Sequence, residues 1–357
     1  MHRSEHIVSR MSQPQRILIV RPSALGDVAR TVPALVTLRR AFPDAVIDWL
    51  VQDTYADIVR HHPALNNVVP FPRKRFSRMH RDPSSLREFI RWSRSLRAAR
   101  YDWVIDLQGL LRSGLFTWLT RAPLRVGPSD AREGAWLGYN KRIDPGTAPH
   151  TVDRMLAVLS GLGLPIVTDL SLYVGDADRT WLSTFAQQNS LTLDRYAVVA
   201  PTAKWLSKCW PIDRYTKLAQ RLLQSQRVGE RIVILAAPSE KQQIQPLLTA
   251  LGNRAIVPST TVGQMAAVLS RAALVVCNDS APLHIAVGFN RPVVAMFGPT
   301  DPAKVGPYHR DDSVVQPPNG SVSSAGYRSN PDDQTLVASI EFDRVWEKVE
   351  QQLSLLS

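Results

Sequence analysis

The feature that most constrains the fold is an alternation of short β-branched runs with longer amphipathic stretches. The run RILIV at residues 16–20 is followed by a turn-like segment, RPSALGD, and then by VARTVPALVTLRRAF, in which apolar residues recur at helical spacing. Residues 45–51 (AVIDWLV) and 102–108 (DWVIDLQ) repeat the strand pattern. Strands that alternate with helices predict a parallel sheet covered by helices.

A second series of the same kind begins at YAVVAPT, residues 196–202. It predicts helices at 213–224, from about 239 and at 262–270, and strands at 231–237, 255–258, 273–279 and 292–298. Because 357 residues suffice for two domains, we predict an α/β fold of two Rossmann-like, doubly wound domains that face each other across a cleft at the carboxyl ends of their strands. The expected organisation is a polar tail at 1–15, a first domain at 16–175, a linker region at 176–195, a second domain at 196–335 and an amphipathic helix at 336–357.

Composition limits the class of protein. Hydrophobic residues make up 44% and charged residues 21%, which is typical of globular chains and excludes a largely disordered one. No apolar stretch approaches the roughly 18 to 20 residues that span a bilayer, and the first fifteen residues lack the apolar run of a signal peptide. The two cysteines, Cys209 and Cys277, lack metal-ligand spacing and fit a reducing compartment. We therefore expect a cytoplasmic protein that neither spans a membrane nor is exported by that route.

The formal charge of +12 favours an anionic partner and is concentrated in one segment. Residues 73–100 carry ten Lys and Arg residues against two acidic ones, and Arg87, Arg91, Arg94 and Arg97 follow helical spacing. Such a stripe suits nucleic acid, an anionic lipid surface or a phosphorylated glycolipid, and it is also compatible with a merely solvated helix face. The charge pattern alone leaves these interpretations open.

The motif SALGD at 23–27 lies directly after the first predicted strand and opens a helix. Gly26 permits a tight turn, and Asp27 is placed at the helix N-terminus. A carboxylate there suits a general base towards a sugar hydroxyl, because proton abstraction needs an acceptor aimed within hydrogen-bond reach. The alternative is that Asp27 only caps the helix.

Three strand ends of the second domain carry groups suited to phosphate. Lys208, in KCWP, is a compact charge suited to a diphosphate, although Lys204 competes for that role and a solvated loop lysine fits the pattern as well. The segments NDSAPLH at 278–284 and FGPTDP at 297–302 follow strands, where small and hydroxyl residues offer backbone N–H groups and a helix dipole to phosphate oxygens. His284 either reaches such a phosphate or packs within its helix. The sequence Asp-Ala-Asp at 176–178 looks like a metal-binding pair but precedes a helix, so we interpret it as capping and expect no metal.

Taken together, the motifs resemble those of the ADP-heptose:lipopolysaccharide heptosyltransferases, with heptosyltransferase I the most similar branch. The resemblance covers about residues 16–308. It is carried by RILIVRPSALGDVARTVPALVTLRRAFP, YDWVIDLQGLLRSG, AREGAWLGYNKRID with the following HTVDR, KCWP and NDSAPLHIAVGFNRPVVAMFGPTDP, in this order and spacing.

This resemblance implies a GT-B fold and a metal-independent, inverting transfer of heptose from ADP-heptose to Kdo of the lipopolysaccharide inner core. It implies no cofactor besides the donor substrate. Asp27 would be the general base, and Lys208 would stabilise the departing diphosphate. The residues implied for the donor are Glu240, as a ribose contact, and Asp279, Ser280, Ala281, His284, Gly298, Pro299 and Thr300. Those expected at the acceptor are Ser23, Gly26, Arg73, Arg75, Arg78, Gln108 and Arg132.

The implied partners are ADP-heptose, a Kdo-lipid A or related anionic glycolipid, and the inner face of the inner membrane, with no nucleic acid. Ala281 departs from the glycine that the family often has there, which keeps open a different acceptor, such as a second core heptose or a protein, or another nucleotide sugar. An inactive protein that binds anionic lipid or nucleic acid is the alternative of another class. The presence of both Asp27 and Lys208 argues against inactivity.

Overall fold

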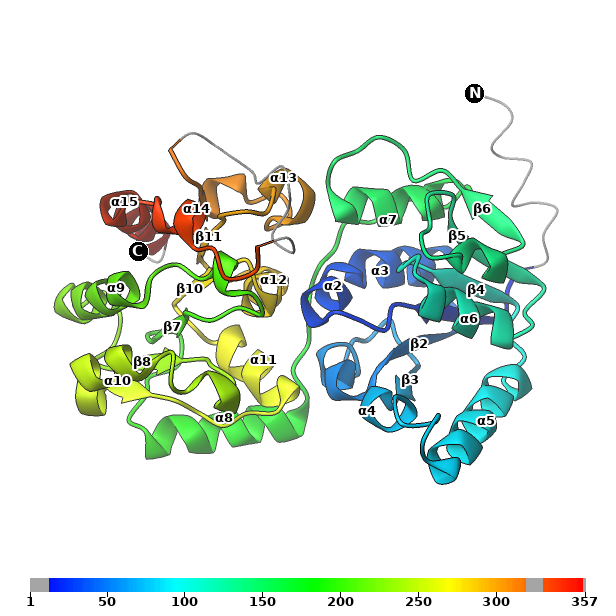
Figure 1. Cartoon of the computed structure of the whole chain (residues 1–357), viewed down its shortest axis with the longest axis horizontal. Helices are drawn as coiled ribbons and strands as arrows, with labels where there is room; N and C mark the ends of the chain where they lie inside the picture. The colour runs from blue at the N-terminus through cyan, green and yellow to red at the C-terminus, as the bar shows by residue number, and fades with distance from the viewer. Residues whose placement is uncertain (1–12, 319–329, 356–357) are drawn as a thin grey trace. The chain divides into compact units, whose positions relative to one another are not determined.

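The computed structural model describes residues 13–318 and 330–355, so most of the expected N-terminal tail lies outside the described residues. The chain divides into two compact units, Met1–Tyr173 (unit 1) and Val174–Ser357 (unit 2). Each unit contains one six-stranded sheet in which every pairing is parallel, as the alternating pattern predicts (Figure 1). No helix among the described residues is long and apolar enough to cross a membrane.

Unit 1 has the strand order β3-β2-β1-β4-β5-β6. Its strands are β1 Arg16–Val20, β2 Val46–Gln52, β3 Asn67–Phe71, β4 Trp103–Asp106, β5 Leu124–Pro128 and β6 Lys141–Ile143. Its helices are α2 Leu25–Arg30, α3 Val32–Ala41, α4 Arg73–Phe76, α5 Pro83–Ala98, α6 Leu111–Leu119 and α7 Thr151–Ser160, with 3-10 turns η1 Asp53–Ile58 and η2 Ala135–Gly138.

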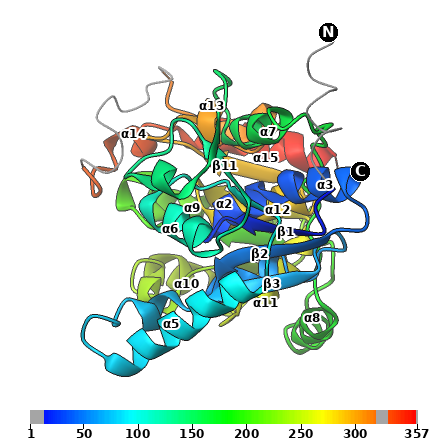
Figure 2. The same cartoon turned by 90° about the vertical axis from the view of Figure 1, so that its right-hand side faces the viewer.

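The sheet of unit 1 is covered on both faces. Leu18 and Val20 of β1 face a core that receives Phe76 from α4, Leu96 from α5 and Phe116 from α6. Helix α3 packs on β2 and on α7, and α5 is the long cyan helix of Figure 2. Because β1 is buried on both sides, it reads as a continuous apolar run rather than as an alternating one.

Unit 2 has the strand order β12-β11-β10-β7-β8-β9. Its strands are β7 Ala197–Ala200, β8 Ile232–Ile234, β9 Ala255–Ile256, β10 Leu274–Asn278, β11 Val293–Met296 and β12 Val314–Val315. Its helices are α8 Asp176–Gln188, α9 Ile212–Gln224, α10 Gln245–Leu251, α11 Val262–Ser270, α12 Ala281–Gly288, α13 Pro302–Val305, α14 Thr335–Ala338 and α15 Phe342–Ser354, with 3-10 turns η3 Leu206–Lys208, η4 Pro238–Glu240, η5 Gly252–Arg254 and η6 Asp311–Ser313. One core joins α9, α10 and α15 to the sheet, while α11 packs against α8 and α12 (Figure 1).

The predicted strands are confirmed within a few residues, and three details differ. The helix predicted from the VARTVPALVTLRRAF stretch is two helices, because the chain breaks at Thr31 and Pro33 lies in the first turn of α3, where its missing N–H costs nothing. The segment expected as a linker at 176–195 forms α8 within unit 2. The short strands β3, β5, β6 and β12 were not predicted, because two to five residues towards the edges of a sheet carry little periodic signal.

Candidate active site

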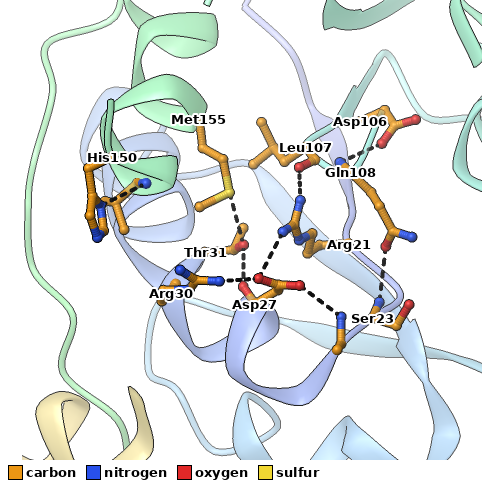
Figure 3. A network of polar contacts seen from close by, with 12 residues as sticks. Arg21, Ser23, Asp27, Arg30, Thr31, Asp106, Leu107, Gln108, His150 and Met155 are labelled. Atoms are coloured by element: carbon orange, nitrogen blue, oxygen red, sulfur yellow. Dashed lines mark hydrogen bonds and ion pairs between the residues drawn. The ribbon is translucent and has the colours of Figure 1, made fainter. Parts of the chain in front are cut away.

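In unit 1, Asp27 lies in the first turn of α2, just beyond the carboxyl end of β1 (Figure 3). Its Oδ1 pairs with the guanidinium of Arg30 and lies 3.4 Å from Nη2 of Arg21, while Oδ2 accepts a 3.2 Å hydrogen bond from the Ala24 N–H. Burial disfavours ionisation, but the charges of Arg21 and Arg30 outweigh it and hold the pKa of Asp27 well below its usual range. Asp27 is therefore a permanent carboxylate at neutral pH, and it occupies the third helical position rather than the N-cap, which is Ala24.

The two arginines that flank Asp27 are nearly buried, with residue exposures of 7% for Arg21 and 6% for Arg30. Arg21 also donates to the carbonyl of Leu107, at the end of β4. Two guanidiniums flank this one carboxylate, and guanidinium N–H groups suit a substrate that carries an acidic group. We did not predict either arginine, although Asp27 and Arg30 have the i, i+3 spacing that brings side chains together on a helix.

A second loop of the site is built on a buried carboxylate, Asp106, at the end of β4. Its side chain is fully buried and accepts hydrogen bonds from the Gln108 N–H (2.8 Å), the Gly109 N–H (3.1 Å) and the Tyr139 hydroxyl (2.6 Å). Burial raises the pKa of Asp106, and this effect outweighs that of the hydrogen bonds, which lower the pKa. The side chain of Gln108 in turn accepts a 3.1 Å bond from the Ser23 N–H (Figure 3), so Asp106 fixes the loop that reaches the predicted acceptor residues.

The predicted acceptor residues Ser23, Gly26, Gln108 and Arg132 lie on neighbouring segments. Gly26 is in the first turn of α2, beside Asp27. The Arg132 N–H donates to the carbonyl of Gly109 at 2.9 Å, which joins the loop before η2 to the Gln108 loop. Gly109 has φ +67°, and its freedom from a Cβ allows this turn.

The basic residues predicted to meet the acceptor are spread over α4 and the turn after it. Arg73 and Arg75 belong to α4, and Arg78 follows it. Arg75 is ion-paired with Glu88 of α5, so its charge is compensated within the unit. Burial and the charge of Arg73 lower the pKa of Arg112, which places this cation from α6 beside the predicted set although the sequence patterns did not single it out.

In unit 2, three predicted residues meet at the carboxyl ends of neighbouring strands. Lys208 Nζ lies 2.6 Å from Oδ2 of Asp279, which follows β10, and the Thr300 hydroxyl donates to the same oxygen at 2.8 Å. All three are largely buried, with side-chain exposures of 14% for Lys208 and 8% for Asp279. The loop of Lys208 is held by Asn278, whose side chain accepts from the Trp210 N–H at 3.0 Å. Asn278 lay within a predicted motif but was not assigned a role.

The other predicted donor residues surround this cluster in the same unit. Ser280 precedes the first turn of α12, Ala281 begins that helix, and His284 is 5% exposed within it. Gly298 and Pro299 follow β11, and a Cβ at Gly298 would lie 2.7 Å from Cβ of Val337.

Glu240 forms a separate contact in unit 2. It accepts from the Thr202 hydroxyl at 2.8 Å and from the Ala237 N–H at 2.7 Å, beyond the ends of β7 and β8.

In the part of the chain that the structure describes, no three His, Cys, Asp or Glu side chains are grouped as metal ligands. Asp176 instead lies in the first turn of α8 and pairs with Arg179.

The chain is similar in sequence and in structure to known proteins. The model of glycosyltransferase family 9 (heptosyltransferase) matches residues 89–328. Lipopolysaccharide heptosyltransferase 1 of Pseudomonas aeruginosa is 31% identical over 83% of this chain and 82% of its own length. The structure of E. coli heptosyltransferase WaaC with ADP-2-deoxy-2-fluoro heptose superposes with a TM-score of 0.75 at 26% identity, covering 94% of this chain and 99% of that one. The structure of E. coli ADP-heptose lipopolysaccharide heptosyltransferase II, at 22% identity, shares the fold with a TM-score of 0.74 over 95% of this chain and 99% of that one.

Proposed function

Because the chain belongs to glycosyltransferase family 9, the heptosyltransferases, we propose that it transfers heptose from ADP-heptose to Kdo of the lipopolysaccharide inner core, with lipid A–Kdo as acceptor and inversion at the anomeric carbon. The observation that carries the proposal is the Asp27 carboxylate just beyond β1, which two buried arginines, Arg21 and Arg30, keep ionised.

The proposed reaction is a direct displacement. A hydroxyl oxygen of the acceptor forms a bond to the anomeric carbon of the heptose while the bond from that carbon to the β-phosphate oxygen of ADP breaks. Asp27 takes the hydroxyl proton, and ADP leaves with the bonding electron pair. Holding the reactants in line supplies much of the rate, so the loop network of Asp106, Gln108 and Ser23 acts by positioning the acceptor.

We propose that unit 2 stabilises the negative charge that develops on the leaving diphosphate. Lys208 would stabilise the developing negative charge on the diphosphate, in place of a divalent cation. Its 2.6 Å contact with Asp279 and the Thr300 hydroxyl on the same carboxylate fix the ammonium, so that it is already oriented when the donor binds. The N-terminal turn of α12, with Ser280 and Ala281, would offer backbone N–H groups to phosphate oxygens, and Glu240 would contact the ribose.

An anionic acceptor is supported by the guanidiniums of Arg21 and Arg30 beside Asp27 and by Arg73, Arg78 and Arg132. A Kdo carboxylate and lipid A phosphates carry the complementary charge. We place the enzyme peripherally on the inner face of the inner membrane, where such an acceptor is embedded, and expect no function in nucleic-acid binding.

The test is ADP release from ADP-heptose in the presence of Kdo-lipid A, with and without EDTA. Wild-type protein should release ADP only with acceptor and equally well in EDTA, and Asp27→Asn should lose at least a hundredfold in kcat. The matched control is Asp57→Asn, because Asp57 and Arg60 form an i, i+3 pair in the same unit that is largely exposed. ADP binding without acceptor-dependent release would overturn the Kdo acceptor and favour another one. Release that survives in Asp27→Asn would remove Asp27 from the base role.

A further inference from the structure

The exposed face of α6 carries large apolar residues, which are unusual on a solvated helix face. Leu111, Leu115 and Trp118 follow i, i+4, i+7 spacing and are 57%, 42% and 39% exposed. On the inner face the same helix buries Ser113 and Thr117, together with Gly114 and Phe116. A helix that exposes leucine and tryptophan while it buries hydroxyl side chains indicates a second apolar environment outside the unit.

The turn η2 extends this apolar surface. Trp136 is 39% exposed and Leu137 is 69% exposed. Two glycines lock η2 against α6, since a Cβ at Gly114 would lie 2.6 Å from Cα of Ala135 and a Cβ at Gly138 would lie 2.8 Å from the carbonyl carbon of Gly114. Leu111, Leu115, Trp118, Trp136 and Leu137 therefore lie on two elements held rigidly together, and we call these five residues the apolar patch.

The apolar patch lies in the region where the exposed large hydrophobic side chains are concentrated. Of the large hydrophobic side chains that are exposed in the described part of the chain, eight lie between Met79 and Leu137 and five in all the remainder. Leu86 and Ile90 of α5, which packs against α6, belong to the first group. Concentration in one region of one unit points to a specific contact rather than to the scattered exposure that is normal on protein surfaces.

Cations accompany both tryptophans of the apolar patch. The Arg121 guanidinium lies 3.8 Å from the ring centroid of Trp118, and that of Arg142 lies 4.8 Å from the ring centroid of Trp136. Residues 73–142 contain sixteen Lys and Arg against six Asp and Glu, a net charge of +10 out of the +12 of the whole chain. Tryptophan beside arginine is the combination found at the boundary between lipid headgroups and acyl chains, where the ring enters the interface and the cation meets phosphate.

We infer that the apolar patch and the arginines around it form a docking surface for an anionic lipid bilayer. A second copy of the chain is disfavoured as the occupant, because two such basic surfaces repel each other. Nucleic acid is disfavoured because its phosphates cannot bury the three leucines of the apolar patch, whereas lipid acyl chains can.

The position of the apolar patch suits a lipid-anchored acceptor, and in this respect the inference rests on the proposed function. Helix α6 begins three residues after Gln108, and η2 begins three residues after Arg132, so both elements of the apolar patch start from loops of the candidate acceptor site. A bilayer bound there would present its headgroups next to these loops.

The experiment is sedimentation of the full chain with vesicles of phosphatidylethanolamine and phosphatidylglycerol, compared with vesicles of phosphatidylcholine alone. The wild-type protein should bind the anionic vesicles, more weakly as salt is raised. The variant Leu115→Gln/Leu137→Gln should bind at least tenfold more weakly, with unchanged thermal unfolding because both side chains are exposed. Leu355→Gln is the matched control, since Leu355 of unit 2 is 70% exposed and should not affect binding.

Two further readouts separate the possible outcomes. Lipids brominated in the acyl chain should quench tryptophan fluorescence in the wild type and much less in Trp118→Phe/Trp136→Phe. Transfer to a deacylated, water-soluble Kdo acceptor should be unchanged in the leucine variant, while transfer to acceptor in vesicles should fall at least tenfold. Wild-type vesicle binding by the leucine variant, or a wild-type dimer that this variant disrupts without any vesicle binding, overturns the inference. Vesicle binding as expected but no transfer to either acceptor contradicts the proposed function and leaves the docking surface standing.

Discussion

Replacing Asp27 by Asn removes the carboxylate that pairs with both Arg21 and Arg30, and it should destabilise unit 1 as well as affect chemistry. Loss of one partner from a buried ion pair costs about 3–5 kcal/mol, because the remaining charge is left in a poorly solvated place. The Asp27 side chain keeps 29% exposure, so we expect the lower end, about 3 kcal/mol. For a unit of this size that lowers the unfolding midpoint by roughly 6–12 °C.

A second substitution should restore part of the stability that Asp27→Asn loses. Asp27→Asn/Arg30→Met removes both charges and replaces the guanidinium with an apolar chain, and it should be more stable than Asp27→Asn alone by about 1–2 kcal/mol. The exposed pair of Asp57 and Arg60 provides the control, because Asp57→Asn should change stability by less than about 1 kcal/mol.

Amide hydrogen exchange at pH 7, followed by mass spectrometry of peptides from β1 and β4, measures the effect within unit 1. Peptides of unit 2 serve as the internal reference. In Asp27→Asn, exchange of the slowest β1 amides should accelerate by about a hundredfold, which corresponds to roughly 3 kcal/mol. Wild-type exchange rates in Asp27→Asn, or a double variant no more stable than the single one, would show that the ion pair does not stabilise unit 1. A stable double variant that still lacks transfer activity would assign the lost activity to chemistry rather than to unfolding.

Three other predictions concern different parts of the molecule. Burial lowers the pKa of His62 to about 4, so the unfolded chain binds the proton first as pH falls, and protonation favours unfolding. Unit 1 should keep its full stability above about pH 6.5 and lose about 2 kcal/mol of it by pH 5. Urea unfolding should show this pH dependence reduced in His62→Asn and unchanged in the exposed control His61→Asn. Gly114→Ala should cost about 3 kcal/mol because its Cβ would meet the backbone of Ala135, whereas Gly146→Ala, with open space and only a positive φ to satisfy, should cost about 1 kcal/mol in the same thermal scan. Lys208→Met should lower kcat by about a hundredfold or more and weaken ADP binding, while Lys204→Met should leave kcat within a few fold; equal losses in the two variants would contradict the assignment of Lys208.

The sequence patterns located the candidate site because they located strand ends. In a parallel sheet the carboxyl ends of all strands lie at one edge, so residues that follow strands are brought together regardless of their separation along the chain. Lys208, Asp279 and Thr300 were predicted on this basis and form one cluster. Ser23 and Gln108, which the resemblance implied for the acceptor, also meet across 85 positions.

The partners of these residues could not be predicted in the same way. Asp106 was interpreted as part of a strand, and its role depends on burial and on Tyr139, which approaches from 33 residues away. Arg75 was predicted as an acceptor residue, but its charge is compensated by Glu88 through a contact between α4 and α5. The outer face of α6 was missed for a further reason. In LLRSGLFTWL apolar residues fall on both the buried and the exposed face, so periodicity does not show which side of the helix is buried.

The low pKa of Asp27 sets a condition on its proposed role. A carboxylate held by two guanidiniums is a weak base, so it cannot remove a proton from a free sugar hydroxyl to any useful extent before the bond to the anomeric carbon forms. As that bond forms, the attacking oxygen becomes strongly acidic, and even a weak base then accepts its proton. Proton transfer is therefore expected late in the step, and Asp27 contributes through its orientation and its permanent negative charge. The variant Arg30→Met should raise the pKa of Asp27. It should therefore show a fall in kcat at acidic pH that the wild type lacks.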